Sequence, residues 1–228
     1  MDRASAHNRN FAAALGTLAV LAYGVGLALQ HFPLRLVAKP WPVLVLVWFL
    51  LQDGRHSYGQ RIRWGLLACI AGDLLLEAGP ATFLPAMAAF LVGHLSFITA
   101  FLERSRAPRL GLAIPSFGLG AAVLAWLWPG LEGSPLAVPV VIYTTVLCAM
   151  LWRGAAGLGS GRGDRLAAAG ALLFVASDSL IALARFGPEP YAGWTALPYA
   201  IIALYWLAQW GIAASAWSWR PPDDRLSG

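Results

Sequence analysis

Ionisable side chains occur inside otherwise apolar stretches of this chain. Asp73, Glu77 and His94 fall within AGDLLLEAGPATFLPAMAAFLVGHLSFITAF, and Asp178 falls within GALLFVASDSLIALARFGP. A charged group at the centre of a bilayer costs about 3 kcal/mol on insertion scales, so such residues usually face a bundle interior or a wet cavity. Carboxylates and imidazole exchange protons, so the chemistry that these residues could perform is acid–base catalysis or proton transfer.

The spacing of these residues predicts which of them share a site. Asp73 and Glu77 are four apart, so they project from one face of a helix. Two bare carboxylates on one face repel each other, which predicts that one is protonated or paired with a cation. Lys39, the only lysine in the chain, is the expected partner, although a lysine can also extend to lipid headgroups. We expect His94 to find a polar partner in Asp73 or Glu77, although it also belongs to an aromatic stripe typical of a core.

Asp178 has its own polar neighbours along the chain. The hydroxyls of Ser177 and Ser179 could donate to its carboxylate, and Arg185 lies seven residues further on along the same helix face. Other apolar stretches hold further polar residues that could orient a carboxylate or a lipid headgroup: Tyr143, Tyr205 and Gln209. A role as an interfacial aromatic explains Tyr143 slightly better, and packing explains Tyr205 and Gln209 almost as well.

The composition predicts the elements that position these residues. Of 228 residues, 59% are hydrophobic and 12% are charged, against about 25% charged in soluble domains. The fold class is therefore predicted to be all-α, a polytopic membrane helix bundle, and a span needs about 20 residues. Because the connections are short, residues 1–228 are expected to form one integral membrane domain with polar tails at 1–10 and 220–228. The eight predicted spans are Phe11–Leu29, Leu34–Leu51, Ile62–Leu76, Thr82–Leu102, Leu110–Trp128, Leu136–Trp152, Leu166–Phe186 and Thr195–Trp217.

The basic residues predict the orientation of these eight transmembrane helices. Thirteen of the 16 lysines and arginines fall in the N-terminal segment, the C-terminal segment and the loops on that same side. Only Arg35, Lys39 and Arg185 fall on the other side. Lysine and arginine in short loops collect in the cytoplasm, so both termini are predicted to be cytoplasmic. Orientation and contact with anionic lipids explain these basic loops better than nucleic-acid binding.

Several familiar site patterns are not met. Cys69 and Cys148 fall inside predicted spans and suggest neither a disulfide framework nor a CxxC site. Only one of the four histidines, His94, lies well inside a span, so the pattern for a metal site is weak. We therefore expect no metal and no cofactor.

Five motifs follow one another in an order that resembles a known family. They are KP at Lys39, GDLLL from Gly72, FLVGHLSFITAF from Phe90, GALLFVASDSLIALARF from Gly170 and YWLAQ from Tyr205. Together they resemble the YhhN family of lysoplasmalogenases, which includes transmembrane protein 86 of animals. The resemblance covers most of the chain from the second to the eighth span. It implies an integral membrane hydrolase that cleaves the vinyl ether bond of lysoplasmalogens to a fatty aldehyde and a glycerophospho-ethanolamine or -choline.

The resemblance also implies a set of site residues. Where the family often has a tyrosine three residues after the histidine, this chain has Phe97, and Glu77 joins the set on its spacing alone. As a hypothesis, Asp73 is the general acid and Asp178 the base that activates water, and the opposite assignment is equally allowed. Lys39 and Arg185 would hold the lipid phosphate. The matching positions are Lys39, Asp73, His94, Ser177 and Asp178 and, less firmly, Tyr143, Tyr205 and Gln209.

Other functions fit the same residues. A membrane lipid-binding protein or a proton-coupled transporter could use these carboxylates, although no clear inverted repeat is visible. A zinc hydrolase is a further alternative. The expected partners are a lysophospholipid substrate and membrane lipids, without nucleic acid. The alanine and arginine bias suggests a bacterial inner membrane.

Overall fold

The computed structural model describes residues 3–52, 56–159, 161–187, 194–217 and 219. These residues form helices joined by short turns, with no strand among them. The helices are α1 (Arg3–Ala28), α2 (Phe32–Ala38), α3 (Trp41–Gln52), α4 (Ser57–Ala78), α5 (Phe83–Arg104), α6 (Leu110–Leu131), α7 (Ala137–Ala155), α8 (Arg162–Phe186) and α9 (Leu197–Ala216), with a short 3₁₀ helix, η1 (Pro80–Thr82), before α5.

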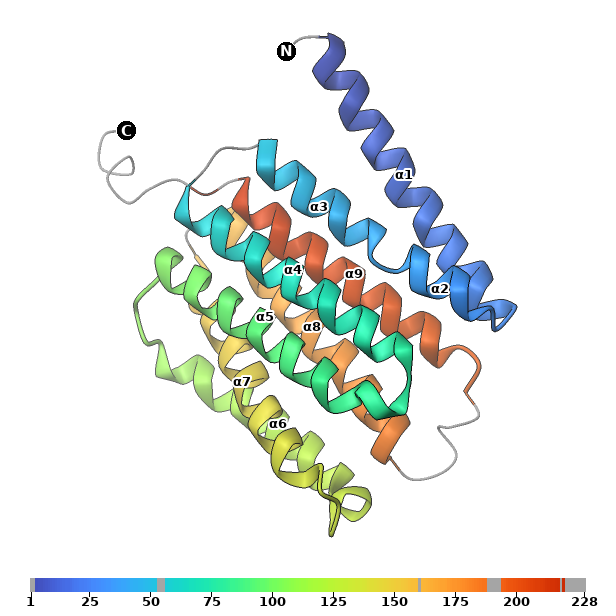
Figure 1. The fold of residues 1–228 in the computed structure, drawn as a ribbon. Helices are drawn as coiled ribbons and strands as arrows, with labels where there is room; N and C mark the ends of the chain where they lie inside the picture. Colours follow the sequence, from blue (N-terminus) through green and yellow to red (C-terminus); the bar gives the residue numbers. More distant parts are fainter. Residues whose placement is uncertain (1–2, 53–55, 160, 188–193, 218, 220–228) are drawn as a thin grey trace.

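Antiparallel helix pairs build the bundle. The α4–α5 and α8–α9 pairs lie in its middle, the α6–α7 pair covers one side, and α1 lies on the other side, inclined to the rest (Figure 1). Glycines let the central pairs approach closely, as is usual between membrane helices. A Cβ atom added at Gly72 would lie 2.8 Å from the Phe90 ring, and one at Gly170 would lie 2.7 Å from the Ala208 carbonyl oxygen.

The prediction of an all-α polytopic membrane bundle is confirmed. Seven helical stretches among the described residues are long and apolar enough to cross a membrane, with α2 and α3 (Phe32–Gln52) forming one of them. The predicted span Ile62–Leu76 is not among the seven. It lies in α4, which is long enough, but its polar residues include Arg61, Arg63, Asp73 and Glu77. Helix α4 packs inside the bundle against α3, α5 and α9.

The predicted span Leu34–Leu51 is interrupted. Helix α2 ends at Ala38, Lys39 caps it, and α3 begins at Trp41. Pro40 and Pro42 cannot donate the backbone hydrogen bonds that would continue α2, so the chain turns between the two helices. Lys39 therefore lies at a break in a membrane-crossing element.

The ends of the chain add one difference. Helix α1 begins at Arg3, so most of the segment 1–10 expected to be a polar tail is helical. The tail expected at 220–228 lies outside the described residues. The start of α1 and the end of α9 lie at the same end of the bundle (Figure 1).

Candidate active site

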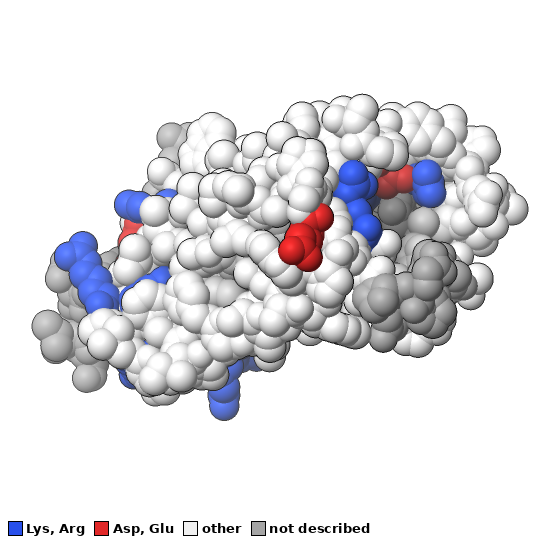
Figure 2. Space-filling model, turned by 90° about the horizontal axis from the view of Figure 1, so that it is seen from below, with Lys and Arg blue, Asp and Glu red and all other residues white. Residues whose placement is uncertain are grey.

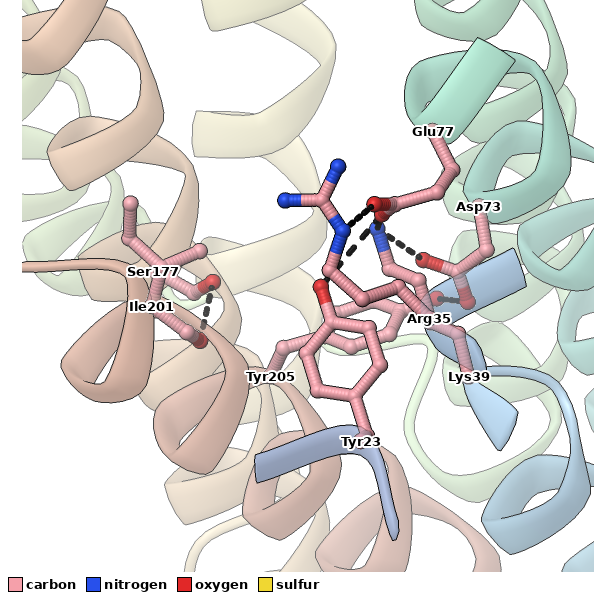
Figure 3. Close-up of polar contacts among 8 residues, drawn as sticks. All are labelled: Tyr23, Arg35, Lys39, Asp73, Glu77, Ser177, Ile201 and Tyr205. Carbon is pink, nitrogen blue, oxygen red and sulfur yellow. Dashed lines mark hydrogen bonds and ion pairs between the residues drawn. The ribbon is translucent and has the colours of Figure 1, made fainter. Parts of the chain in front are cut away.

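Lys39 lies between the two carboxylates of α4, as expected. Its Nζ is 3.2 Å from Glu77 Oε2 and 3.6 Å from Asp73 Oδ1 (Figure 3). Both Lys39 and Asp73 are buried. The four-residue spacing puts the carboxylates on one helix face, and the break between α2 and α3 places the ammonium group against that face.

Two members of this cluster were not predicted as site residues. Arg35 Nε is 2.8 Å from Glu77 Oε1, and the Tyr23 hydroxyl donates to Glu77 Oε2 at 3.4 Å (Figure 3). Arg35 precedes Lys39 by four residues, and this spacing on one helix face was a signal that could have identified it. Tyr23 gave no signal, because one hydroxyl in an apolar helix resembles core packing. With Arg35 included, two cations face two carboxylates, and the cluster is electrically balanced.

Both oxygens of the Asp73 carboxyl group are engaged. Tyr205 in α9 donates to Asp73 Oδ2 at 2.6 Å, while Lys39 faces Oδ1. A cation and a hydroxyl donor both stabilise the ionised form of a carboxyl group. These contacts suit Asp73 to a role as a carboxylate.

Asp178 has different surroundings. The Tyr143 hydroxyl donates to Asp178 Oδ2 at 2.5 Å, and no lysine or arginine pairs with Asp178 in the described part of the chain. His94 Nε2 lies 3.9 Å from the same oxygen, too far for a hydrogen bond. Oδ1 of Asp178 has no partner among the described residues, which leaves it able to carry a proton.

The predicted partner of His94 was wrong. The nearest carboxylate is Asp178 in α8, not Asp73 or Glu77 in the adjacent helix α4. His94 is fully buried, its ring contacts Tyr143 and Phe174, and neither ring nitrogen has a hydrogen-bond partner among the described residues. The rotation of α5 about its axis turns His94 toward α7 and α8. The residues next to His94 in the sequence give no information about this rotation.

The serine before Asp178 also differs from expectation. Ser177 donates to the Ile201 carbonyl oxygen of α9 at 3.0 Å (Figure 3). It makes no hydrogen bond to Asp178. Consecutive side chains of a helix point about 100° apart, so Ser177 faces α9 while Asp178 faces α7. Ser177 therefore joins helices α8 and α9.

One cavity of about 620 Å³ connects the two acidic residues. Asp73 and Asp178 both line it, together with Lys39, Glu77, Tyr205, Ser177 and Arg185. The Arg185 guanidinium lies 4.0 Å from the centre of the Phe83 ring and forms no ion pair within the described residues. Basic side chains beside an acidic one are visible at the right of Figure 2, separated by a mostly uncharged area from the basic side chains at the left.

Gln209 does not line this cavity. Its amide is buried in α9 beside the Cys69 thiol. Neither the amide oxygen nor the amide nitrogen has a well-formed hydrogen bond within the described residues. Among those residues, no group of three or more His, Cys, Asp or Glu side chains is arranged to hold a metal ion.

Several known proteins are similar in sequence to this chain. Human lysoplasmalogenase TMEM86B is 36% identical over 187 residues, which cover 79% of this chain and 74% of the human protein. Lysoplasmalogenase TMEM86A of Bos taurus is 37% identical over 203 residues, 83% of this chain and 81% of the bovine protein. The lysoplasmalogenase of Mycobacterium bovis is 36% identical over 141 residues, 58% of this chain and 53% of that protein. No solved structure gives a significant match. The model of the YhhN family matches residues 34–216, and the chain therefore belongs to the YhhN family.

Proposed function

We propose that this protein is a lysoplasmalogenase, a membrane hydrolase that cleaves the vinyl ether bond of lysoplasmalogens. The observation that carries the proposal is one cavity lined by two aspartates with different surroundings. Asp73 lies beside a cation, and Asp178 has none paired with it among the described residues. Relatives that bear the name lysoplasmalogenase, from a bacterium and from mammals, support it.

The reaction requires an acid and a base. An acid protonates the β-carbon of the vinyl ether, which gives an oxocarbenium ion. A base takes a proton from water as the water oxygen bonds to the α-carbon, and the resulting hemiacetal collapses to a fatty aldehyde and a glycerol hydroxyl. Glycosidases pass through a similar cation with two carboxyl groups in distinct roles.

The surroundings of the two aspartates favour the second of the two assignments left open by the sequence. Asp178, which pairs with no cation in the described part of the chain, is the general acid, and its Oδ1 carries the proton. Asp73, held ionised by Lys39 and Tyr205, stabilises the oxocarbenium ion and activates water. Tyr143 positions Asp178 through its hydrogen bond, and the His94 ring packs against Tyr143.

Arg185 is the better candidate for binding the lipid phosphate. Lys39 is already engaged by two carboxylates, whereas Arg185 lines the same cavity without an ion pair to any described residue. Glu77 and Arg35 balance the charge around Lys39. They affect the substrate indirectly, by holding Lys39 in place.

The membrane setting is part of the proposal. With α4 as the eighth crossing, both termini face the cytoplasm and the cavity opens on the opposite side, near Arg35, Lys39 and Arg185. A bacterial inner membrane is the proposed location.

The test is aldehyde release from 1-alkenyl-lysophosphatidylethanolamine by the detergent-purified protein. We expect release by the wild type, none from the saturated 1-alkyl analogue, and a loss of about 100-fold or more in both Asp73→Asn and Asp178→Asn. Glu132→Gln, an exposed acid at the end of α6, is the matched control and should retain activity.

A parallel reaction with a chelator tests for a metal requirement. Absence of release by folded wild type, with proton-coupled lipid flux in proteoliposomes, would instead support a transporter.

A further inference from the structure

A second cavity lies next to the polar one and has a different character. It is a narrow slot between α5, α6, α7 and α8, with a volume of about 70 Å³ against about 620 Å³ for the polar cavity. Carbon atoms form most of its walls, and its polar side chains are Tyr143, Thr144, Asp178 and Ser179. A narrow apolar slot suits an extended hydrocarbon chain and not a hydrated headgroup.

The slot and the polar cavity are adjacent. They share five lining residues: Leu76, Phe83, Phe90, Asp178 and Ile181. Asp178 therefore lies where the polar cavity meets the apolar slot. In an alkenyl lysolipid the vinyl ether bond also lies where the polar headgroup meets the apolar chain, so a lipid spanning both cavities would place this bond beside Asp178.

The slot runs along the bundle beside the polar cavity. Its lining in α8 runs from Phe186 to Val175, eleven residues, which corresponds to about 16 Å of helix. At the Val175 end, α6 and α7 are close together. A Cβ atom added at Gly120 would lie 2.3 Å from Cys148 Sγ and 3.2 Å from Thr144 Cγ2.

We propose that this slot holds the hydrocarbon chain of the lysolipid and that Gly120, Thr144 and Cys148 at its deep end determine which chain lengths are accepted. The inference rests on the proposed function, because it assigns the second half of the same substrate. Its position beside the cavity that both aspartates line, with Asp178 in the shared wall, identifies the occupant as the substrate chain.

Matched variants on two helices test the chain-length role. Thr144→Phe fills the slot, whereas Thr145→Phe places the same ring on an exposed position one residue later. Gly120→Ala brings a methyl group against Cys148, whereas a methyl group at Gly118 meets nothing within 4 Å. We expect Thr144→Phe and Gly120→Ala to lower kcat/KM for a hexadecenyl chain relative to an octenyl chain by about 10-fold or more. Thr145→Phe and Gly118→Ala should keep the wild-type ratio.

A second measurement does not depend on turnover. A 1-alkyl-lysophosphatidylethanolamine with a diazirine at the end of its chain is bound to the full-length protein, irradiated, and the labelled peptides are mapped by mass spectrometry. We expect labels in α6 near Gly120 and in α7 near Cys148, competed by unlabelled lysolipid. Labels confined to other helices, or chain-length ratios unchanged in active Thr144→Phe and Gly120→Ala, would overturn the slot assignment. Slot labelling by a wild type that cleaves no alkenyl lipid would support the slot and reject the hydrolase.

Discussion

At the scale of single residues, the proposed chemistry depends on two identical side chains in different surroundings. Asp73 has a lysine at one oxygen and a tyrosine hydroxyl at the other. Among the described residues, Asp178 has a tyrosine hydroxyl at one oxygen and no partner at the other. The difference arises from the neighbouring helices and not from the aspartates themselves. Lys39 contributes most to it, because it is the cation between the two carboxylates of α4.

Replacing Lys39 tests this arrangement. Lys39→Met leaves two buried carboxylates with only Arg35 as cation, and the loss of one partner of a buried ion pair costs about 3–5 kcal/mol. Lys39→Arg keeps the charge but puts a larger, planar group between the carboxylates. We expect Lys39→Met to lower the thermal unfolding temperature clearly. Lys39→Arg should stay folded and lose about 100-fold in kcat, the effect of a misplaced group.

The control is Arg35→Met, whose partly exposed side chain pairs with Glu77 alone. Its effect on kcat should be smaller than that of Lys39→Arg. Full activity in Lys39→Met would contradict the proposed role of this cation.

The sequence predicted part of this site for identifiable reasons. The pairing of Lys39 with Asp73 and Glu77 could be predicted from two features. The helical repeat puts the two carboxylates on one face, and the distribution of basic residues between the loops puts Lys39 on the less basic side of the membrane. The partner of His94 could not be predicted, because it depends on how α5 is rotated against α8. Asp178 in α8 follows His94 by 84 residues in the sequence. The narrow slot was also inaccessible, since a cavity depends on the sum of many side-chain volumes.

At the scale of the elements, the break between α2 and α3 positions Lys39. Pro40 and Pro42 lie between the end of α2 and the first turn of α3, so the apolar stretch is divided into two helices. The sequence therefore indicated the apolar span correctly and missed its interruption. The interruption matters because Lys39, the cap of α2, supplies the ammonium group of the site.

Restoring the helix should move Lys39. The double variant Pro40→Ala, Pro42→Ala supplies the two missing backbone donors, so α2 and α3 can join into one helix with a different path. We expect kcat/KM for the alkenyl lysolipid to fall by about 10-fold or more while the protein stays folded. Pro115→Ala, at an exposed position inside α6, is the control and should leave activity unchanged. Wild-type activity in the double variant would show that the break does not position the site.

At the scale of the whole molecule, buried charges occur at both ends of the bundle and have different roles. Arg104 ends α5 about 30 Å from Phe83, which lines the polar cavity. Arg104 Nε is 2.6 Å from Asp164 Oδ1, and its Nη1 donates to the Ser215 carbonyl oxygen at 2.9 Å. This cluster joins α5, α8 and α9 far from the aspartates of the proposed reaction.

Its removal should affect stability and leave the chemistry intact. Asp164→Ala leaves a buried guanidinium without its carboxylate, and we expect a loss of about 3–5 kcal/mol in the free energy of unfolding. Replacing both partners with apolar residues, Arg104→Met with Asp164→Leu, should recover much of that loss. The measurement is thermal unfolding in detergent, with kcat determined below the unfolding temperature. If kcat in Asp164→Ala fell as far as in Asp178→Asn, the two ends of the bundle would not have separate roles.

The central claim is that an acid in the cavity protonates the β-carbon of the vinyl ether, and hydrolysis in D₂O tests it most directly. The account predicts that the released aldehyde carries one deuterium on the carbon next to the carbonyl group, measured by mass spectrometry within a few turnovers. The same aldehyde incubated alone in D₂O corrects for exchange. Aldehyde released by the wild type without deuterium at that carbon would contradict the mechanism, because the bond would then break without protonation of carbon.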